Sequence, residues 1–114
     1  MGDNALFLLP DLRRARDLID RDYAEPLDLD AMAREAGYSR FHFARAFKAA
    51  VGRSPHRYIS DRRLERAKAL LAGGDRSLVD IALVLSFSCQ ANFTRAFRAA
   101  TGQTPGQYRR DLSA

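Results

Sequence analysis

Apolar residues recur at helical spacing along most of this 114-residue chain. In residues 11–23, for example, Leu12, Ala15, Ile19 and Tyr23 lie three or four positions apart with polar residues between them. Such spacing places apolar side chains on one face of an amphipathic helix. Continued along the chain, the pattern predicts an all-α fold of about seven helices, over residues 11–23, 28–36, 40–51, 54–71, 77–85, 89–101 and 105–112.

Short turns separate two pairs of the predicted helices. Asp28 can cap the second predicted helix. After that helix, Gly37 supplies a tight turn, Ser39 can cap the next helix, and Gly52 ends it. A short helix, a glycine-containing turn and another helix form a helix-turn-helix. The same order returns in residues 77–101. We therefore expect two helix-turn-helix subdomains joined by a long connecting helix, residues 54–71, which spans about 25 Å at roughly 1.5 Å per residue.

The second half of the chain repeats the first. Residues 39–58 and 89–108 align at an offset of 50. The turn before each segment aligns at an offset of 49, which places Ser86 at the position of Gly37. The second copy therefore has one extra residue between this turn and the segment that follows it. We expect both copies to face the same kind of partner. The residues of the first copy that recur unchanged in the second are Phe43, Arg45, Ala46, Phe47, Ala49, Ala50, Gly52, Pro55 and Tyr58.

Positive charge concentrates on the repeated segments. The chain has a net charge of +5, but residues 1–35 contain nine acidic and five basic residues, whereas residues 36–60 contain five basic residues and no acidic one. Residues 81–114 contain four basic residues and one acidic residue. Clustered basic side chains attract phosphates and release counterions on binding, so a polyanion is the first partner to consider. Solvated arginine-rich helices are the alternative interpretation of charge alone, and the repeat favours a shared partner.

The predicted helix at residues 40–51 has two different faces. An exposed Phe41 beside Arg45 is unusual for a solvated face, but it suits a helix in the DNA major groove. There, arginine reads guanine and an apolar group contacts the thymine methyl. At about 100° per residue, the face expected in the core carries Phe43, Ala46, Phe47 and Ala50. The opposite face carries Phe41, Ala44, Arg45 and Lys48, with Arg40 and His42 beside it.

The predicted helix at residues 89–101 divides in the same way. Glutamine and asparagine suit adenine edges, and arginine suits guanine, so its outward residues also fit base reading. The face expected in the core carries Phe93, Ala96, Phe97 and Ala100. The outward face carries Ala91, Thr94, Arg95 and Arg98, with Gln90 and Asn92 on the leading turn.

At this point the chain resembles the DNA-binding domain of AraC/XylS-type transcriptional regulators, over about residues 9–112. The motifs that carry the resemblance are A-x3-GYS at 33–39, F-x-R-x-F-K-x3-G-x-S-P-x2-Y at 43–58, R-L-x2-A-x2-LL at 63–71, D-IA-x3-SF at 80–87 and F-T-R-A-F-R-x3-G-x-T-P-x2-Y at 93–108. The resemblance implies a first helix-turn-helix subdomain at 9–54, a connecting helix at 55–72 and a second subdomain at 73–112.

The resemblance further implies a sequence-specific regulator of transcription that binds double-stranded DNA. Its recognition helices, about 40–51 and 89–101, are expected to enter successive major-groove segments roughly 34 Å apart. Base contacts are then expected from Arg40, Phe41, Ala44, Arg45, Gln90, Ala91, Asn92, Thr94 and Arg95. Contacts to phosphate, which position the protein without reading sequence, are expected from Lys48, Arg53, Arg57 and Arg98.

Two departures from the family pattern affect these expectations. Ser86 replaces the usual glycine of the second turn and costs about 1 kcal/mol if that position needs a positive φ. Ala44 and Ala91 are small at positions where longer side chains often reach bases, which leaves the operator sequence open. A helical protein-interaction module and a non-specific nucleic-acid binder remain as alternative functions.

The sequence also limits the chemistry of the chain. No nucleophile–base constellation is visible, so we expect no enzyme activity, and the two histidines and one cysteine lack metal-ligand spacing, so we expect no metal or cofactor. Cys89 begins a helix, where a thiolate is favoured, and redox sensing is an alternative to a small residue near DNA. A single cysteine fits a reducing cytoplasm, and the lack of a long apolar run predicts no membrane association. The family resemblance implies that this cytoplasm is bacterial and that the chain acts at the nucleoid. RNA polymerase is an expected protein partner, and the chain is either a monomeric regulator or a fragment of a longer one.

Overall fold

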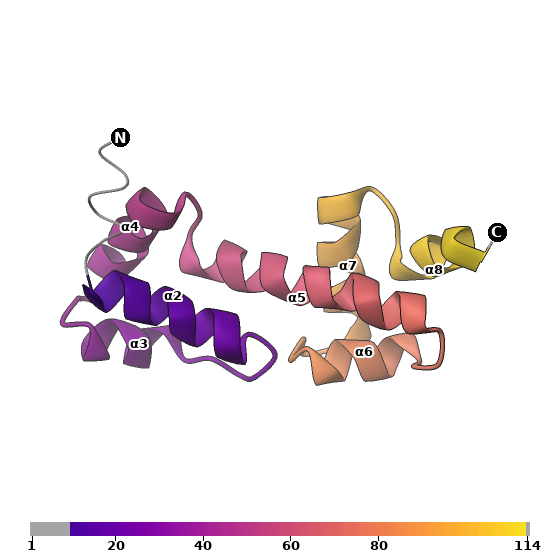
Figure 1. Cartoon of the computed structure of the whole chain (residues 1–114), viewed down its shortest axis with the longest axis horizontal. Coiled ribbons are helices and arrows are strands. Elements are labelled where there is room, and N and C mark those ends of the chain that lie inside the picture. The colour runs from indigo at the N-terminus through magenta and orange to yellow at the C-terminus, as the bar shows by residue number, and fades with distance from the viewer. Residues whose placement is uncertain (1–9, 114) are drawn as a thin grey trace. The chain divides into compact units, whose positions relative to one another are not determined.

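A computed structural model describes residues 10–113, which form seven α-helices and no strand in that range. This confirms the predicted all-α class, and the predicted helix ends fall within about two residues of the observed ones. Figure 1 labels the helices along the chain. They are α2 (Pro10–Asp22), α3 (Leu29–Glu35), α4 (Arg40–Val51), α5 (Pro55–Gly73), α6 (Leu78–Val84), α7 (Gln90–Thr101) and α8 (Pro105–Ser113).

The contacts between residues divide the chain into two compact units. The first unit extends to Ile59 and the second begins at Ser60, so the division falls within α5. The first unit contains α2, α3 and α4, and the second contains α6, α7 and α8. The functional division at 9–54, 55–72 and 73–112 stays a prediction. No helix among the described residues is both long and apolar enough to cross a membrane.

In the first unit, α2, α3 and α4 enclose one hydrophobic core. Leu12 and Ile19 of α2 and Phe43 and Phe47 of α4 are buried, which confirms their predicted inward placement. Met32 of α3 is buried with them. The two phenylalanine rings pack against each other along α4, tilted by 48° with centroids 5.8 Å apart. Burying such side chains stabilises the unit by roughly 1.5–3 kcal/mol each. This core fixes which face of α4 points outward.

Local capping sets the turn between α3 and α4. The side chain of Asp28 caps α3 by accepting hydrogen bonds from the Asp30 and Ala31 backbone amides, at 3.0 and 3.2 Å. Gly37 lies in the left-handed region at φ +80°, and Ser39 Oγ accepts a hydrogen bond from the His42 amide at 3.1 Å. These observations confirm the turn and the two N-caps predicted from the sequence.

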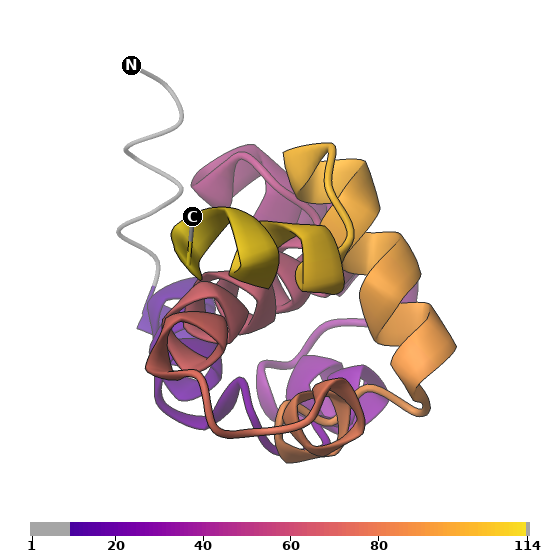
Figure 2. The ribbon, with the colours of Figure 1, turned by 90° about the vertical axis from the view of Figure 1, so that its right-hand side faces the viewer.

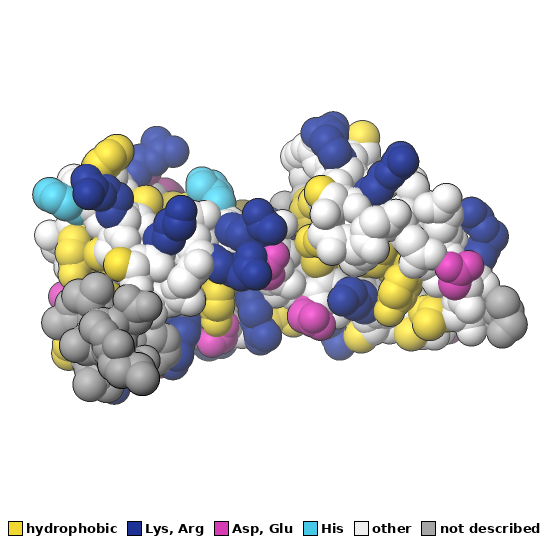
Figure 3. Space-filling model, turned by 90° about the horizontal axis from the view of Figure 1, so that it is seen from above, with side chains coloured by type: hydrophobic (Ala, Val, Ile, Leu, Met, Phe, Trp, Pro, Cys, Tyr) yellow, Lys and Arg dark blue, Asp and Glu magenta, His cyan; other side chains and the backbone are white. Residues whose placement is uncertain are grey.

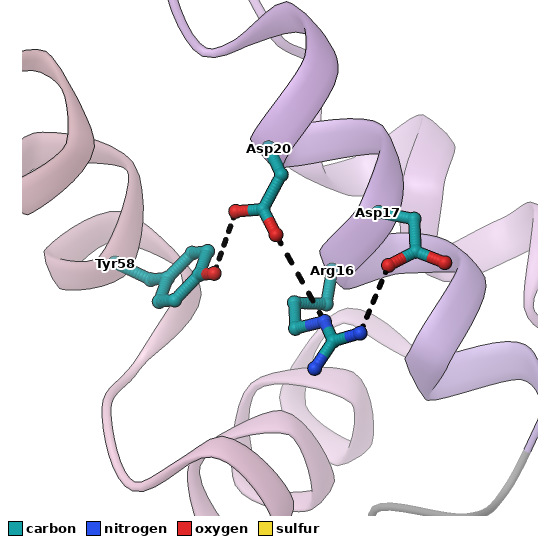
Figure 4. A network of polar contacts seen from close by, with 4 residues as sticks. All are labelled: Arg16, Asp17, Asp20 and Tyr58. Atoms are coloured by element: carbon teal, nitrogen blue, oxygen red, sulfur yellow. Dashed lines mark hydrogen bonds and ion pairs between the residues drawn. The ribbon is translucent and has the colours of Figure 1, made fainter.

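A polar network joins α2 to the first turn of α5 within the first unit (Figure 4). The Tyr58 hydroxyl donates a hydrogen bond to Asp20 Oδ1 at 2.6 Å. Arg16 of α2 lies between the two acids, with its Nε 3.9 Å from Asp20 Oδ2 and its Nη2 3.0 Å from Asp17 Oδ1. The Tyr58 ring also packs edge-on against Phe47, at 5.7 Å between centroids. Tyr58 therefore ties the start of α5 to both α2 and α4.

The second unit repeats this core around α7. In Figure 2, where the second unit faces the viewer, α7 lies beside α6 and α8, and the residue contacts agree. Phe93 and Phe97 of α7 are buried, together with Ile81 of α6 and Leu85, the residue that follows α6. Phe97 packs edge-on against Tyr108 of α8 at 5.4 Å, the counterpart of the Phe47 contact in the first unit.

Two arginines connect α5 to other parts of the second unit. Arg109 Nε donates a hydrogen bond to the carbonyl oxygen of Leu71, at 3.3 Å. The guanidinium carbon of Arg63 lies 5.9 Å from the centroid of the Phe87 ring, and its partial burial lowers the pKa of Arg63. An aromatic face attracts a guanidinium, so the ring offsets part of the cost of burying this charge.

The turn between α6 and α7 confirms the prediction made for Ser86. This residue lies in the left-handed region at φ +64°, the one non-glycine residue there among the described residues. The following backbone hydrogen bond, from the Phe87 amide to the Ala82 carbonyl at 2.9 Å, matches that from Tyr38 to Ala33 in the first unit. Both turns thus have the same backbone conformation, but only the first uses glycine.

The prediction that Ala100 lies in the core was wrong. Its counterpart Ala50 is buried, but Ala100 is exposed. Helical spacing gives the direction in which a side chain points, but not how far the neighbouring elements extend along the helix. Ala100 belongs to the last turn of α7, beyond the buried Phe93 and Phe97.

Candidate nucleic-acid interface

The outward face of α4 combines an aromatic ring with basic side chains. Phe41 is 69% exposed, and the guanidinium carbon of Arg45, one turn further along, lies 5.5 Å from its ring centroid. Lys48 is exposed on the next turn, whereas Ala44 is half-buried. The helix contains no acidic residue. Because the buried phenylalanines fix the opposite face, this arrangement presents Phe41 and Arg45 to solvent as one unit.

Arg40, at the start of α4, is paired with an acidic residue of α3. Its Nε lies 3.3 Å from Asp30 Oδ1, and both side chains are well exposed. The sequence predicted Arg40 as a base contact but did not predict this partner, since the two residues are ten positions apart and meet only across the folded turn. An exposed ion pair of this kind contributes about 0–1 kcal/mol, so a phosphate or a base can compete for the arginine.

The outward face of α7 is also free of acidic residues. Arg95 and Arg98 are exposed at the positions of Arg45 and Lys48 in the first copy. Gln90 and Ala91 are exposed as well, whereas Asn92 and Thr94 are half-buried. The sequence-predicted residues of each copy therefore gather on one helix face, although they extend from fully exposed to half-buried.

The first turn of α7 differs from that of α4. Cys89 is the N-cap residue, and its side chain makes no capping hydrogen bond. The preceding Ser88 instead accepts a hydrogen bond from Nδ2 of Asn92. The extra residue of the second copy, visible in the sequence, was the signal of an altered helix start, but it did not show which side chain Ser88 would contact.

The remaining predicted phosphate contacts lie at the start of α5. Arg53 and Arg57 are exposed on either side of Ser54, whose Oγ accepts a hydrogen bond from the Arg57 amide at 3.2 Å. Thr104 caps α8 in the same way, since its Oγ1 accepts from the Gln107 amide at 3.1 Å. A capped helix therefore follows both α4 and α7, the two predicted recognition helices. On the face drawn in Figure 3, Lys and Arg side chains are more prominent than acidic ones.

A hollow of about 260 Å³ lies between α2 and α3. Its floor is formed by small and apolar side chains, and its rim carries Asp11, Arg14 and Glu35. Its lining contains no serine, cysteine or histidine that could act as a nucleophile or as an imidazole base. Among residues 10–113, no group of three or more His, Cys, Asp or Glu side chains is placed to hold a metal ion.

Two helix-turn-helix units, each with exposed basic side chains on its second helix, define a class of DNA-binding regulators. The model of a family described as "Helix-turn-helix domain" matches residues 32–111. The chain belongs to this family, the AraC-type helix-turn-helix regulators, whose members are DNA-binding transcription regulators and not enzymes.

Individual relatives agree with this assignment. The probable transcription factor PqrA of Proteus vulgaris is 40% identical over 67 residues, which are 59% of this chain and 55% of PqrA. The right origin-binding protein of Escherichia coli K12 is 44% identical over 66 residues, 58% of this chain and 23% of that protein. The chain therefore matches about half of one relative and about a quarter of the other.

A solved structure of similar fold contains DNA. It is the DNA-binding domain of AdpA, described as a global transcriptional factor, in complex with a target DNA. The two chains superpose with a TM-score of 0.80 and are 26% identical, over 88% of this chain and 90% of that one.

Proposed function

We propose that this chain regulates transcription by binding double-stranded DNA sequence-specifically, with α4 and α7 as recognition helices in successive major-groove segments. The observation that carries this proposal is the repeated helix face. In both copies an exposed arginine, Arg45 or Arg95, projects from an acid-free helix whose opposite side is anchored by two buried phenylalanines. A rigidly anchored helix with outward arginine is what reading guanine in the major groove requires.

The proposed roles divide the outward residues into readers and anchors. The readers of bases are Arg40, Phe41, Ala44, Arg45, Gln90, Ala91, Asn92, Thr94 and Arg95. The phosphate contacts are Lys48, Arg53, Arg57 and Arg98, whose charges lie later in each recognition helix or beyond it. The proposal extends to the bacterial nucleoid as the place of action, and to RNA polymerase as a partner of the bound regulator.

The primary experiment is selection of bound duplexes from a random DNA pool with the purified chain at near-physiological salt. Enrichment of two sequence blocks about 10 bp apart supports specific binding by both recognition helices of one chain. A single enriched block means that one helix reads while the other only anchors. If no sequence is enriched, the selection is repeated with the chain artificially dimerised, which tests the need for a second copy.

Substitutions test the proposed readers. We expect Arg45→Ala and Arg95→Ala each to cost about 1–3 kcal/mol on the selected site and to relax specificity at one base pair. Arg21→Ala is the matched control, because Arg21 is an exposed arginine of α2 that pairs with Asp22. Equal losses on selected and random duplexes would reassign the arginine concerned to phosphate.

Lys48 tests the proposed anchors. Lys48→Ala should weaken binding by the same factor on every sequence. It should also reduce the slope of log affinity against log salt by about one unit, because one phosphate contact is lost. Titrations at four or more salt concentrations measure that slope, and a slope equal to that of the unsubstituted chain would contradict the assignment.

A protein-interaction module is the second candidate, and one observation favours it. α6 exposes Val79, Leu83 and Val84. Such an apolar face is typical of surfaces that meet other proteins. The two candidates differ in their response to sequence, because an interaction module shows no preference among duplexes, whereas a regulator discriminates by several kcal/mol against random DNA.

A further inference from the structure

The extra residue before α7 changes what a serine does at the start of the helix. In the first copy Ser39 is the N-cap, and its Oγ accepts the His42 backbone amide at 3.1 Å. In the second copy the N-cap is Cys89, so Ser88 lies one position before the helix. The Ser88 hydroxyl accepts a hydrogen bond from the side chain of Asn92 instead. The serine that caps the backbone in one copy thus holds a side chain in the other.

The group that Ser88 holds is suited to reading one kind of base. A carboxamide has one carbonyl oxygen and two N–H donors. Adenine presents one acceptor and one donor to the major groove, so a bidentate contact uses the oxygen and one N–H of the amide. Ser88 accepts from Nδ2 of Asn92, which leaves the amide oxygen and the second N–H to pair with the base.

Holding the amide before binding also has an energetic consequence. A half-buried Asn92 that is already oriented loses less conformational freedom when DNA binds. The first copy offers no such arrangement, because His42 occupies the position of Asn92 and Ser39 is used by the backbone. Reading of a base by an amide that is held before binding is therefore expected from the second unit only.

We propose that Ser88 is a positioning residue that orients Asn92 to read an A·T base pair. This inference rests on the proposed binding of DNA by α7. Ser88 itself need not touch DNA, so its effect on sequence preference has to pass through Asn92. Removing its hydroxyl should therefore alter discrimination at the base pair that Asn92 reads and at no other.

The test compares Ser88→Ala, Ser88→Thr and Asn92→Ala in the full chain, on the selected duplex and on versions with one base pair changed. Asn92→Ala identifies the base pair by loss of discrimination there. Ser88→Ala should reduce discrimination at that same base pair by about two- to tenfold, the cost of ordering one side chain on binding. Ser88→Thr keeps the hydroxyl and should behave like the unsubstituted chain. In the double variant, Ser88→Ala should have no further effect once Asn92 is alanine.

A measurement on the free chain tests the hydrogen bond separately. The two side-chain amide protons of Asn92 should shift in NMR spectra of Ser88→Ala and keep their positions in Ser88→Thr. Unchanged discrimination in Ser88→Ala overturns the proposal, and so does an equal loss of affinity on all duplexes, which indicates that Ser88 supports the fold or binding without affecting the reading of bases. If the unsubstituted chain enriches no sequence either alone or dimerised, the proposed function fails as well, so that result is distinct from failure at Ser88 only.

Discussion

The strained turn before α7 gives a stability prediction that can be compared with the equivalent turn of the first unit. Ser86 lies at φ +64°, whereas its counterpart Gly37 reaches φ +80° without a Cβ. An L-residue in this region costs roughly 1–2 kcal/mol. Glycine avoids that cost but gives up about 0.4–1 kcal/mol through the greater freedom of the unfolded chain. The balance predicts that Ser86→Gly raises the free energy of unfolding by about 0.5–1 kcal/mol.

Three variants separate backbone strain from contacts of the side chain. Ser86→Ala removes the hydroxyl but keeps the Cβ, so the difference between Ser86→Gly and Ser86→Ala reports the balance of backbone strain and unfolded-chain freedom, without the hydroxyl. The reverse change, Gly37→Ala, should destabilise the first turn by a similar amount. A Cβ at Gly37 would meet no atom within 4 Å, so its cost arises from the backbone conformation. The two turns therefore provide equal and opposite tests of one quantity.

The assay is urea unfolding, monitored by the far-ultraviolet circular dichroism of the helices. With a urea dependence of about 1–3 kcal/mol per molar, a change of this size moves the midpoint by a few tenths of a molar. Amide hydrogen exchange then shows whether the gain falls on α6 and α7. The reasoning is refuted if Gly37→Ala costs the expected amount while the glycine and alanine variants at Ser86 are equally stable.

Two further predictions use matched pairs in the same way. Tyr58→Phe should cost about 1–2 kcal/mol in urea unfolding because it breaks a hydrogen bond to a carboxylate, whereas Tyr108→Phe should change stability by less than about 0.5 kcal/mol; equal costs would mean that the network at Tyr58 adds nothing. Asp30→Asn should raise DNA affinity a few-fold at low salt by releasing Arg40 and removing a negative charge beside it, and the gain should shrink at high salt. Asp22→Asn is its control, and an equal gain in both variants would point to net charge alone.

Local rules account for most of what could be predicted about the fold. Capping preferences identified Asp28 and Ser39 as N-cap residues. The tolerance of glycine for the left-handed region identified Gly52 as the residue that ends α4. Helical spacing gave the buried phenylalanines of both copies. These signals work because each depends on residues within one or two turns of each other, so the sequence contains all the groups involved.

The parts of the site that escaped prediction depend on contacts across a turn. The ion pair of Asp30 with Arg40 joins two helices, and the bond from Asn92 to Ser88 depends on which residue becomes the N-cap. The contact of Arg63 with the Phe87 ring is of the same kind, since it joins α5 to the turn before α7. Such contacts are set by side-chain directions after packing, which periodicity does not contain.

The repeat itself predicts the form of the DNA site. Arg45 and Arg95 are identical, so the two sequence blocks should share the base pair that these arginines read. The other outward positions differ between the copies, with Arg40, Phe41, His42 and Ala44 in the first and Gln90, Ala91, Asn92 and Thr94 in the second. Because each differing pair has different donors, acceptors and apolar surface, the blocks should diverge at the bases that these residues face.

A selected site with one shared base pair, most simply a G·C pair, inside two otherwise different blocks would fit this reasoning. Exchanging the outward residues of α7 for those of α4 should then convert the second block to the first, while the phenylalanine cores stay as they are. A selected site made of two identical blocks in the unsubstituted chain would refute it. That result would mean that the residues shared by both helices, rather than those that differ, carry the reading of sequence.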